Sequence, residues 1–276
     1  MKRFYGIFLC ILPLAAADVI KEGLYKSLGF GLGYYYYGEW DQVGAPFMHT
    51  DEALFGIVGN LGYAKNGIKV EVSADASFVI GLYTGSVLDS SNPDLKGKPL
   101  KQPTSATIYH GEFKAGYDLL SHFFGASNAT LYAQAGVGYR FYRDGFLSMV
   151  RHQGYLYVPL EIEGEVRLGR KLGLEYLLGY NYLVFGDHKS LASQWHFSED
   201  LIVKQDSGFG LKSFVGLSFK TKSENINTIR LVYEFWSIAA SPSSAFATSS
   251  VTGSSGYLYE PRNKTHTITL QYLYSF

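Results

Sequence analysis

The sequence predicts an all-β protein, a closed antiparallel transmembrane β-barrel of about ten strands, with eight and twelve strands as alternatives. Apolar and polar residues alternate with a period of two in stretch after stretch. The chain holds 31 Gly, 23 Tyr and 19 Phe, and only 17% of its residues are charged. No run of about 18 apolar residues follows the N-terminal stretch, which excludes helical membrane spans. Glycine and aromatic residues with alternating polarity suit a barrel with a lipid face and a polar lumen.

The first residues have the pattern of an export signal. Lys2 and Arg3 form a basic start, Ile7 to Leu14 form an apolar stretch, and three alanines precede Asp18. The apolar stretch is too short to span a bilayer as a helix. We therefore expect export of the chain and cleavage before Asp18.

The expected organisation has three parts: a signal peptide over residues 1–17, a short periplasmic segment over 18–26, and the barrel over 27–276. Cys10 is the only cysteine, and it lies in the signal peptide. Cleavage would leave a mature chain with no disulfide, no thiol chemistry and no cysteine-ligated metal.

Ten stretches have the polarity period of a strand. They are Ser27 to Gly38, Ala53 to Tyr63, Ile68 to Ile80, Tyr109 to Leu119, Thr130 to Tyr142, Leu156 to Leu168, Leu172 to Val184, Phe209 to Lys220, Ile226 to Ser237 and His266 to Phe276. The Asn66-Gly67 pair predicts a tight hairpin between the second and third. Aromatic residues cluster near strand ends, Tyr37, Tyr155 and Trp236 among them, and we expect their rings in the headgroup zone of the bilayer.

The last stretch places five apolar residues on one face: Ile268, Leu270, Tyr272, Tyr274 and Phe276. This ending resembles the C-terminal signature of bacterial outer-membrane β-barrels, in which a terminal Phe marks the chain for the outer-membrane insertion machinery. The resemblance implies a monomer in the cell outer membrane, with membrane lipid and the insertion machinery as partners.

The lengths of the connections divide into two sets. We expect short turns after the second, sixth and eighth strands, and long loops after the first, third, seventh and ninth, with intermediate lengths after the fourth and fifth. Short turns at one end and long loops at the other are typical of outer-membrane barrels, whose turns are periplasmic and whose loops are extracellular. With ten strands, both termini fall on the periplasmic side.

The inward faces of the predicted strands carry charges of both signs. The candidate lumen residues are Glu71, Asp75, Glu112, Arg140, Glu161, Glu163, Glu165 and Arg230. The lumen of a ten-stranded barrel is narrow and buried charges must pair or be hydrated, so we expect these residues to pair across it. The alternative is that the three glutamates from Glu161 to Glu165 line a cation-selective pore.

Two segments are similar to parts of the omptins, the ten-stranded outer-membrane proteases. Asp89-Ser90-Ser91-Asn92-Pro93 resembles the segment after the omptin catalytic aspartate pair, and Asp187-His188 stands where omptins carry a catalytic Asp and His. The resemblance implies that these groups activate a water for peptide hydrolysis. The chain departs from the pattern in two places: Thr84-Gly85-Ser86 replaces the first Asp-x-Asp, and Asp187 is adjacent to His188.

The remaining composition predicts no metal site, no cofactor and no nucleic-acid partner. The seven histidines show no H-E-x-x-H or H-x-x-x-H spacing, and the formal net charge is zero. The expected function is therefore display of extracellular loops for adhesion or interaction with a surface ligand, or slow solute passage as a small narrow porin. An omptin-like protease is the alternative.

Overall fold

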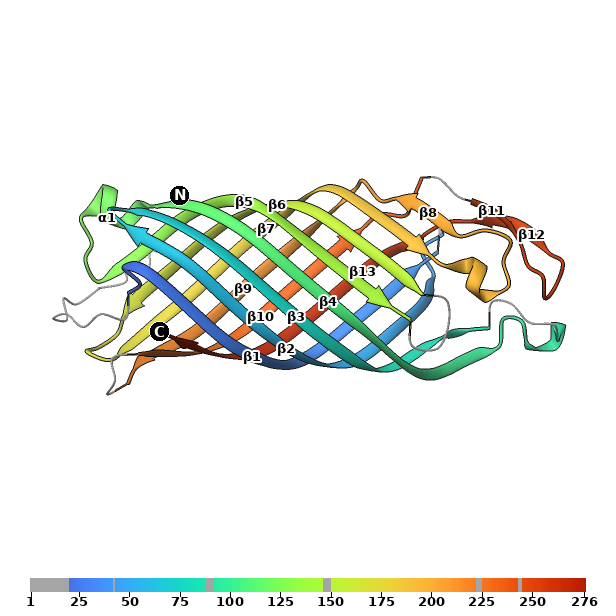
Figure 1. Cartoon of the computed structure of the whole chain (residues 1–276), viewed down its shortest axis with the longest axis horizontal. Coiled ribbons are helices and arrows are strands. Elements are labelled where there is room, and N and C mark those ends of the chain that lie inside the picture. Colours follow the sequence, from blue (N-terminus) through green and yellow to red (C-terminus); the bar gives the residue numbers. More distant parts are fainter. Residues whose placement is uncertain (1–19, 42, 88–91, 146–149, 222–224, 243–244) are drawn as a thin grey trace, which may run out of the picture.

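The chain forms one closed antiparallel β-barrel (Figure 1). The computed structural model describes residues 20–41, 43–87, 92–145, 150–221, 225–242 and 245–276. The expected signal peptide and residues 89–91 lie outside the described part. Within the described residues, no helix is long and apolar enough to span a membrane.

Eleven strands share one sheet, and pairing between β6 and β7 completes the ring. Within that sheet β8 (Leu201–Lys204) pairs only with the end of β7, so the other ten strands close the barrel. The barrel strands are β1 (Gly23–Trp40), β2 (Pro46–Lys65), β3 (Ile68–Ser86), β4 (Pro99–Asp118), β5 (Ala129–Asp144), β6 (Arg151–Arg167), β7 (Leu172–Ser190), β9 (Gly208–Lys220), β10 (Ile226–Ile238) and β13 (Arg262–Ser275). The predicted ten-stranded barrel is confirmed.

The short connections and the two ends of the barrel chain lie together at one end, which we call the turn end. Ser27 pairs with Ser275 there, and the Asn66-Gly67 turn has positive φ at both residues, 54° and 80°. Positive φ at both central residues is the geometry that a two-residue hairpin requires. The turn end also holds a short helix, α1 (Leu119–Phe124) (Figure 1).

The opposite end, which we call the loop end, holds the longer connections. They include two 3₁₀ turns, η1 (Pro93–Leu95) and η2 (Ala192–Trp195), and a two-stranded hairpin of β11 (Ala245–Thr248) and β12 (Ser255–Leu258). The hairpin projects beyond the barrel in Figure 1.

Two predicted loop boundaries were wrong because strand pairing continues further toward the loop end than the apolar pattern. The long loop expected after the first strand is only the connection over residues 41–45, since Pro46 to Glu52 pair with β1. The polar stretch after the third strand is shorter for the same reason, with Pro103 paired opposite Leu82. Backbone hydrogen bonding does not require apolar side chains, so a polar strand end is invisible to a hydrophobic period.

The barrel closes by pairing its first and last strands. β1 and β13 are in register from Ser27 opposite Ser275 to Trp40 opposite Arg262, which satisfies the backbone groups of both. Gly33 sits at a close approach in this seam, where a Cβ would lie 2.1 Å from the Ile268 carbonyl oxygen. A side chain at this position would therefore push the closing strands apart.

The outward face of β13 carries the predicted insertion residues. Ile268, Leu270, Tyr274 and Phe276 are 47%, 56%, 39% and 54% exposed, and Tyr272 is half-buried against Phe30. Leu273, which breaks the predicted alternation, is 1% exposed and faces the lumen. Lipid contact would cover this apolar face, and its reading by insertion machinery stays a prediction.

Candidate functional site: the lumen and the loop end

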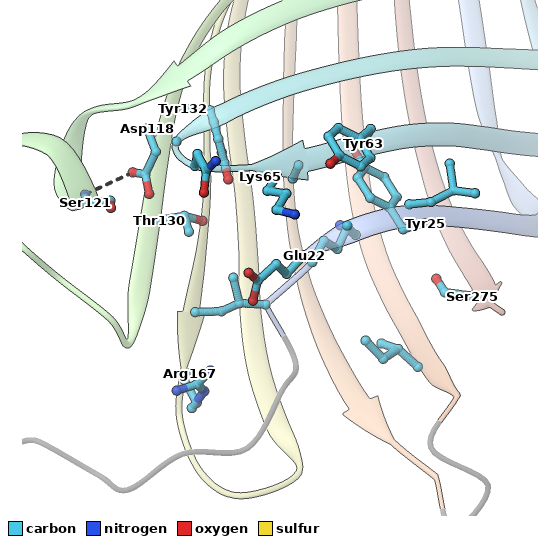
Figure 2. A pocket seen from close by; sticks show the side chains of 18 of the residues that line it. Glu22, Tyr25, Tyr63, Lys65, Asp118, Ser121, Thr130, Tyr132, Arg167 and Ser275 are labelled. Carbon is cyan, nitrogen blue, oxygen red and sulfur yellow. Dashed lines mark hydrogen bonds between the residues drawn. The ribbon is translucent and has the colours of Figure 1, made fainter.

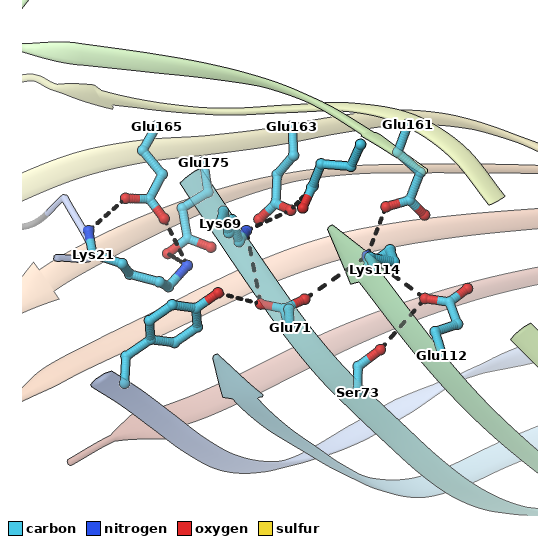
Figure 3. A network of polar contacts seen from close by, with 12 residues as sticks. Lys21, Lys69, Glu71, Ser73, Glu112, Lys114, Glu161, Glu163, Glu165 and Glu175 are labelled. Carbon is cyan, nitrogen blue, oxygen red and sulfur yellow. Dashed lines mark hydrogen bonds and ion pairs between the residues drawn. The ribbon is translucent and has the colours of Figure 1, made fainter. Parts of the chain in front are cut away.

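An ion-pair network fills the turn-end half of the lumen (Figure 3). Lys69 Nζ lies 2.7 Å from a Glu163 carboxylate oxygen and 3.7 Å from Glu71. Lys114 Nζ lies 2.6 Å from Glu161 and 3.8 Å from Glu71. Each lysine therefore joins carboxylates from different strands, which is the arrangement that buried charges require.

Other charged side chains extend this network along the lumen. Lys212 Nζ lies 2.8 Å from Glu112, and an Arg230 guanidinium nitrogen lies 3.3 Å from Glu175. Glu165, the third of the predicted glutamates, pairs with Lys21 at 2.7 Å. All three glutamates of the proposed pore strip are thus buried and paired with cations.

Asp75 and Arg140 lie nearer the middle of the barrel. The Asp75 carboxylate is 3.2 Å from His110 Nδ1, and His110 Nε2 is 3.2 Å from Glu234. Arg140 hydrogen bonds to the Tyr35 hydroxyl at 3.3 Å. The structure therefore places all eight predicted lumen residues inside the barrel, but Arg140 bonds to a phenol where a carboxylate was expected.

An aromatic layer closes the lumen on the loop-end side of these charges. Tyr142 stacks between Tyr35 and Tyr37, with ring centroids 6.1 and 5.8 Å apart, and all three side chains are at most 1% exposed. Trp236 packs on Tyr155 at 6.0 Å and on Tyr157 at 5.0 Å.

The expected headgroup position of three of these rings was wrong. Tyr37, Tyr155 and Trp236 occupy inward positions of their strands and are 1% exposed, whereas Tyr34 and Tyr233 occupy outward positions. The period of two already distinguishes the two sets, because inward and outward residues alternate along each strand.

The space left in the middle of the lumen is small. One cavity of about 50 Å³ lies among Asp75, His110, Arg140 and Glu234, and another of about 70 Å³ lies beside Glu71, Lys114 and Lys212. Room of this size holds a few water molecules at most, since one water occupies about 30 Å³ in the liquid. Paired charges and stacked rings therefore occupy the cross-section of the barrel.

A second polar cluster lies above the aromatic layer, at the loop end. Arg151 bonds to both Glu39 and Asp144, and the Asp144 contact measures 2.7 Å. Glu260, which precedes β13, accepts from Gln153 Nε2 at 3.1 Å and lies 3.0 Å from His188 Nε2. Burial alone would raise the pKa of Glu260, but the nearby His188 and Arg151 lower it overall.

The structure does not bring Asp187 and His188 together as a pair. They occupy successive positions near the end of β7, which direct their side chains to opposite faces. His188 is fully buried in the lumen, and Asp187 is half-buried on the outer face, close to Gly154 and Tyr139.

The surroundings of His188 do not form a nucleophile and base. The Ser190 hydroxyl lies 2.6 Å from His188 Nε2, the same nitrogen that contacts Glu260, and the described residues supply no partner to Nδ1. A Ser-His-carboxylate triad needs the serine and the acid on different nitrogens. The described residues also contain no group of three or more His, Cys, Asp or Glu arranged to hold a metal ion.

A cavity of about 410 Å³ opens above this cluster, between the β11–β12 hairpin and the segment around β8. Glu39, Arg151 and Glu260 line it at the barrel, and Phe47, Phe197, Leu201, Ala247, Tyr257, Leu258 and Pro261 supply apolar walls. We call it the loop-end cavity. A pocket with apolar walls and a few polar groups is the usual form of a small-molecule site.

The comparisons with known proteins concern the fold. No family model and no curated protein match the sequence. Among solved structures, the outer membrane protease OmpT from Escherichia coli matches with a TM-score of 0.61 and 11% identity, over 95% of this chain and 100% of that chain. This chain has the fold of the outer-membrane β-barrels. At this identity the likeness extends to the architecture alone, which confirms the predicted omptin-like barrel.

Two further solved barrels match more distantly. OprG from Pseudomonas aeruginosa has a TM-score of 0.38 at 13% identity, over 95% of this chain and 99% of that chain. The toluene transporter TbuX from Ralstonia pickettii has a TM-score of 0.39 at 9% identity, over 93% of this chain and 90% of that chain.

Sequence reasoning missed Glu39, Arg151 and Glu260 because each was assigned to a strand end or a loop. Glu39 and Arg151 continue the inward positions of β1 and β6, so an extended strand would have revealed them. Glu260 lies outside a strand, and only the fold brings it beside His188.

Proposed function

We propose that this protein is an outer-membrane surface barrel that binds a ligand at its loop end and does not conduct solutes through its lumen. The observation that carries the proposal is the division of the barrel interior. Paired charges and stacked aromatic rings fill the middle of the lumen, and open cavities lie at its two ends, about 410 Å³ in the loop-end cavity and about 970 Å³ at the turn end, which faces the periplasm in the expected orientation. We therefore favour the surface-interaction role over a narrow porin.

The walls of the loop-end cavity define the kind of ligand that it favours. Its lining is largely apolar, with hydroxyls from several Ser and Thr residues at the hairpin. Glu39 is already paired with Arg151 and Glu260 with His188, and Lys96 adds a further charge to the wall. A ligand with an apolar body and neutral hydrogen-bonding edges would bury surface there without leaving Glu39 or Glu260 unpaired.

The test is a set of fluorinated aromatic fragments, observed by ¹⁹F NMR against the protein in nanodiscs. Ala247, 2% exposed, lines the loop-end cavity, so Ala247→Trp should fill it. Ala240→Trp is the matched control, because Ala240 is exposed in the same loop and does not line the cavity. We expect some fragments whose ¹⁹F signals broaden when the wild type or Ala240→Trp is added but stay sharp when Ala247→Trp is added. A fragment set that responds equally to all three proteins would contradict the proposed site.

A further inference from the structure

The helix α1 leaves two large apolar side chains uncovered at the turn end. Phe123 is 67% exposed and Phe124 is 78% exposed, more than most outward side chains of the barrel strands themselves. Two adjacent phenylalanine rings in water are unfavourable relative to burial of the same rings. An apolar environment outside the barrel is therefore needed to cover these rings.

The structure holds α1 in one orientation by capping both of its ends. The Asp118 carboxylate accepts from the backbone N–H of Leu120 at 3.0 Å and also from that of Leu131 on β5 at 2.9 Å. Gly125 ends the helix with φ of 61°, and its N–H donates to the Ser121 carbonyl at 3.1 Å. This N-cap and left-handed C-cap fix the helix against the rim of the barrel.

One side of α1 faces the mouth of the lumen and the other faces outward. Ser121 lines the open cavity of about 970 Å³ at the turn end (Figure 2). His122 Nδ1 lies 3.0 Å from the hydroxyl of Tyr117, which is 40% exposed on the outward face of β4. Phe123 packs on the His122 ring at 4.7 Å and therefore lies on the outward side.

The outward side of α1 is continuous with the lipid face of the barrel. Tyr117 is in register with Ile68 on β3 and with Ala133 on β5, and Ile68 is 55% exposed on the same face. Tyrosine and phenylalanine rings favour the boundary between headgroups and acyl chains. We propose that Phe123 inserts into the phospholipid leaflet at the turn end and anchors this rim of the barrel at the membrane interface.

Nitroxide labels on the two sides of the same helix test the proposal. Single labels are attached at Phe123→Cys and at Ser121→Cys in a Cys10→Ser background, with one barrel in each phospholipid nanodisc. We expect the label at 123 to be more accessible to oxygen than to a water-soluble nickel complex, because oxygen concentrates in lipid. The label at 121 should show the reverse. A label at Leu217→Cys, on the lipid face of β9, calibrates full immersion.

Equal nickel accessibility at positions 121 and 123 would overturn the proposal, because it would place both sides of the helix in water. If a second copy of the protein covered this helix in place of lipid, the label would show no preference for oxygen in discs that hold one barrel. Spin–spin broadening would then appear only in discs that hold two barrels. This result would also overturn the proposal. Both substitutions leave the Asp118 and Gly125 caps intact, so the helix should keep its orientation.

Discussion

Lys21 Nζ lies 2.7 Å from a carboxylate oxygen of Glu165, a residue 144 positions later in the chain. The Lys21 backbone N–H also donates to Glu165, at 2.8 Å, and Nζ lies 3.7 Å from Glu175. The segment before β1 therefore reaches back into the barrel and closes the turn-end limit of the ion-pair network. The segment before β1 is thus joined to β6 and β7, which lie far later in the sequence.

We expect Lys21→Met to destabilise the protein by about 1.5–3 kcal/mol, because Glu165 and Glu175 would lose a charged hydrogen-bonding partner. Lys65→Met is the control, since Lys65 is exposed at the turn end. Urea unfolding in nanodiscs measures both variants. Equal midpoints for the two would show that the Lys21 contacts contribute nothing to stability.

The terminal strand gives a prediction on assembly. Leu270 is 56% exposed opposite Leu32 and Leu231, so Leu270→Arg near the bilayer midplane should cost about 2–4 kcal/mol in cells and in detergent alike. Deleting Phe276 should reduce assembly in cells more than refolding in detergent, where no insertion machinery acts. Heat-modifiable migration on unboiled gels reports both, and Thr269→Ser on the lumen face should migrate as wild type. If both changes were tolerated equally in both settings, β13 would not be the closing strand that carries the signal.

The Glu260 contact gives a prediction on pH. The pKa of Glu260 in the folded protein lies below its ordinary value of 4.5, so its carboxylate stabilises the fold at neutral pH. That stability is present above the ordinary value and is lost as the pH falls through the lowered pKa. We expect the unfolding free energy of the wild type to fall more steeply below about pH 4.5 than that of Glu260→Gln. Parallel pH curves for the two proteins would contradict the assigned interaction.

The orientation in the membrane is checked by cysteine labelling on intact cells. Ser193, in the η2 turn, lies at the loop end, and Asn66 lies at the turn end. Ser193→Cys should react with an impermeant thiol reagent, and Asn66→Cys should react only after the cells are opened. Labelling of Asn66→Cys alone on intact cells would reverse the orientation.

The sequence predicted the barrel well because one physical constraint repeats along the chain. A strand between lipid and a polar lumen must alternate, as β3 does from Ile68 outward to Lys69 inward, and this made the ten strands and most inward charges readable. Beyond the lipid, the outward side chains no longer need to be apolar. The strand residues from Pro46 to Glu52, which pair with β1, therefore lack the alternation and were assigned to a loop.

A local irregularity explains the lumen position of His188, which the polarity pattern does not predict. Tyr157 pairs with Leu183, but the preceding Leu156 pairs with Phe185, so Val184 is an extra residue in β7. This bulge reverses the alternation beyond it and turns His188 to the lumen, where a regular strand would place Asp187. A single extra residue changes the alternation of polar and apolar residues too little to be recognised in the sequence. A search for a period of two therefore does not reveal the bulge.

The most direct test of the proposed function is the conductance of refolded protein in a planar bilayer. The packed lumen predicts no steady conductance for the wild type, because Tyr155 and Trp236 are 1% exposed in stacked contact across the barrel. Phe246→Ala, on the exposed β11–β12 hairpin, should remain equally silent. Large, stable channels in the wild type would contradict the closed lumen and favour a porin.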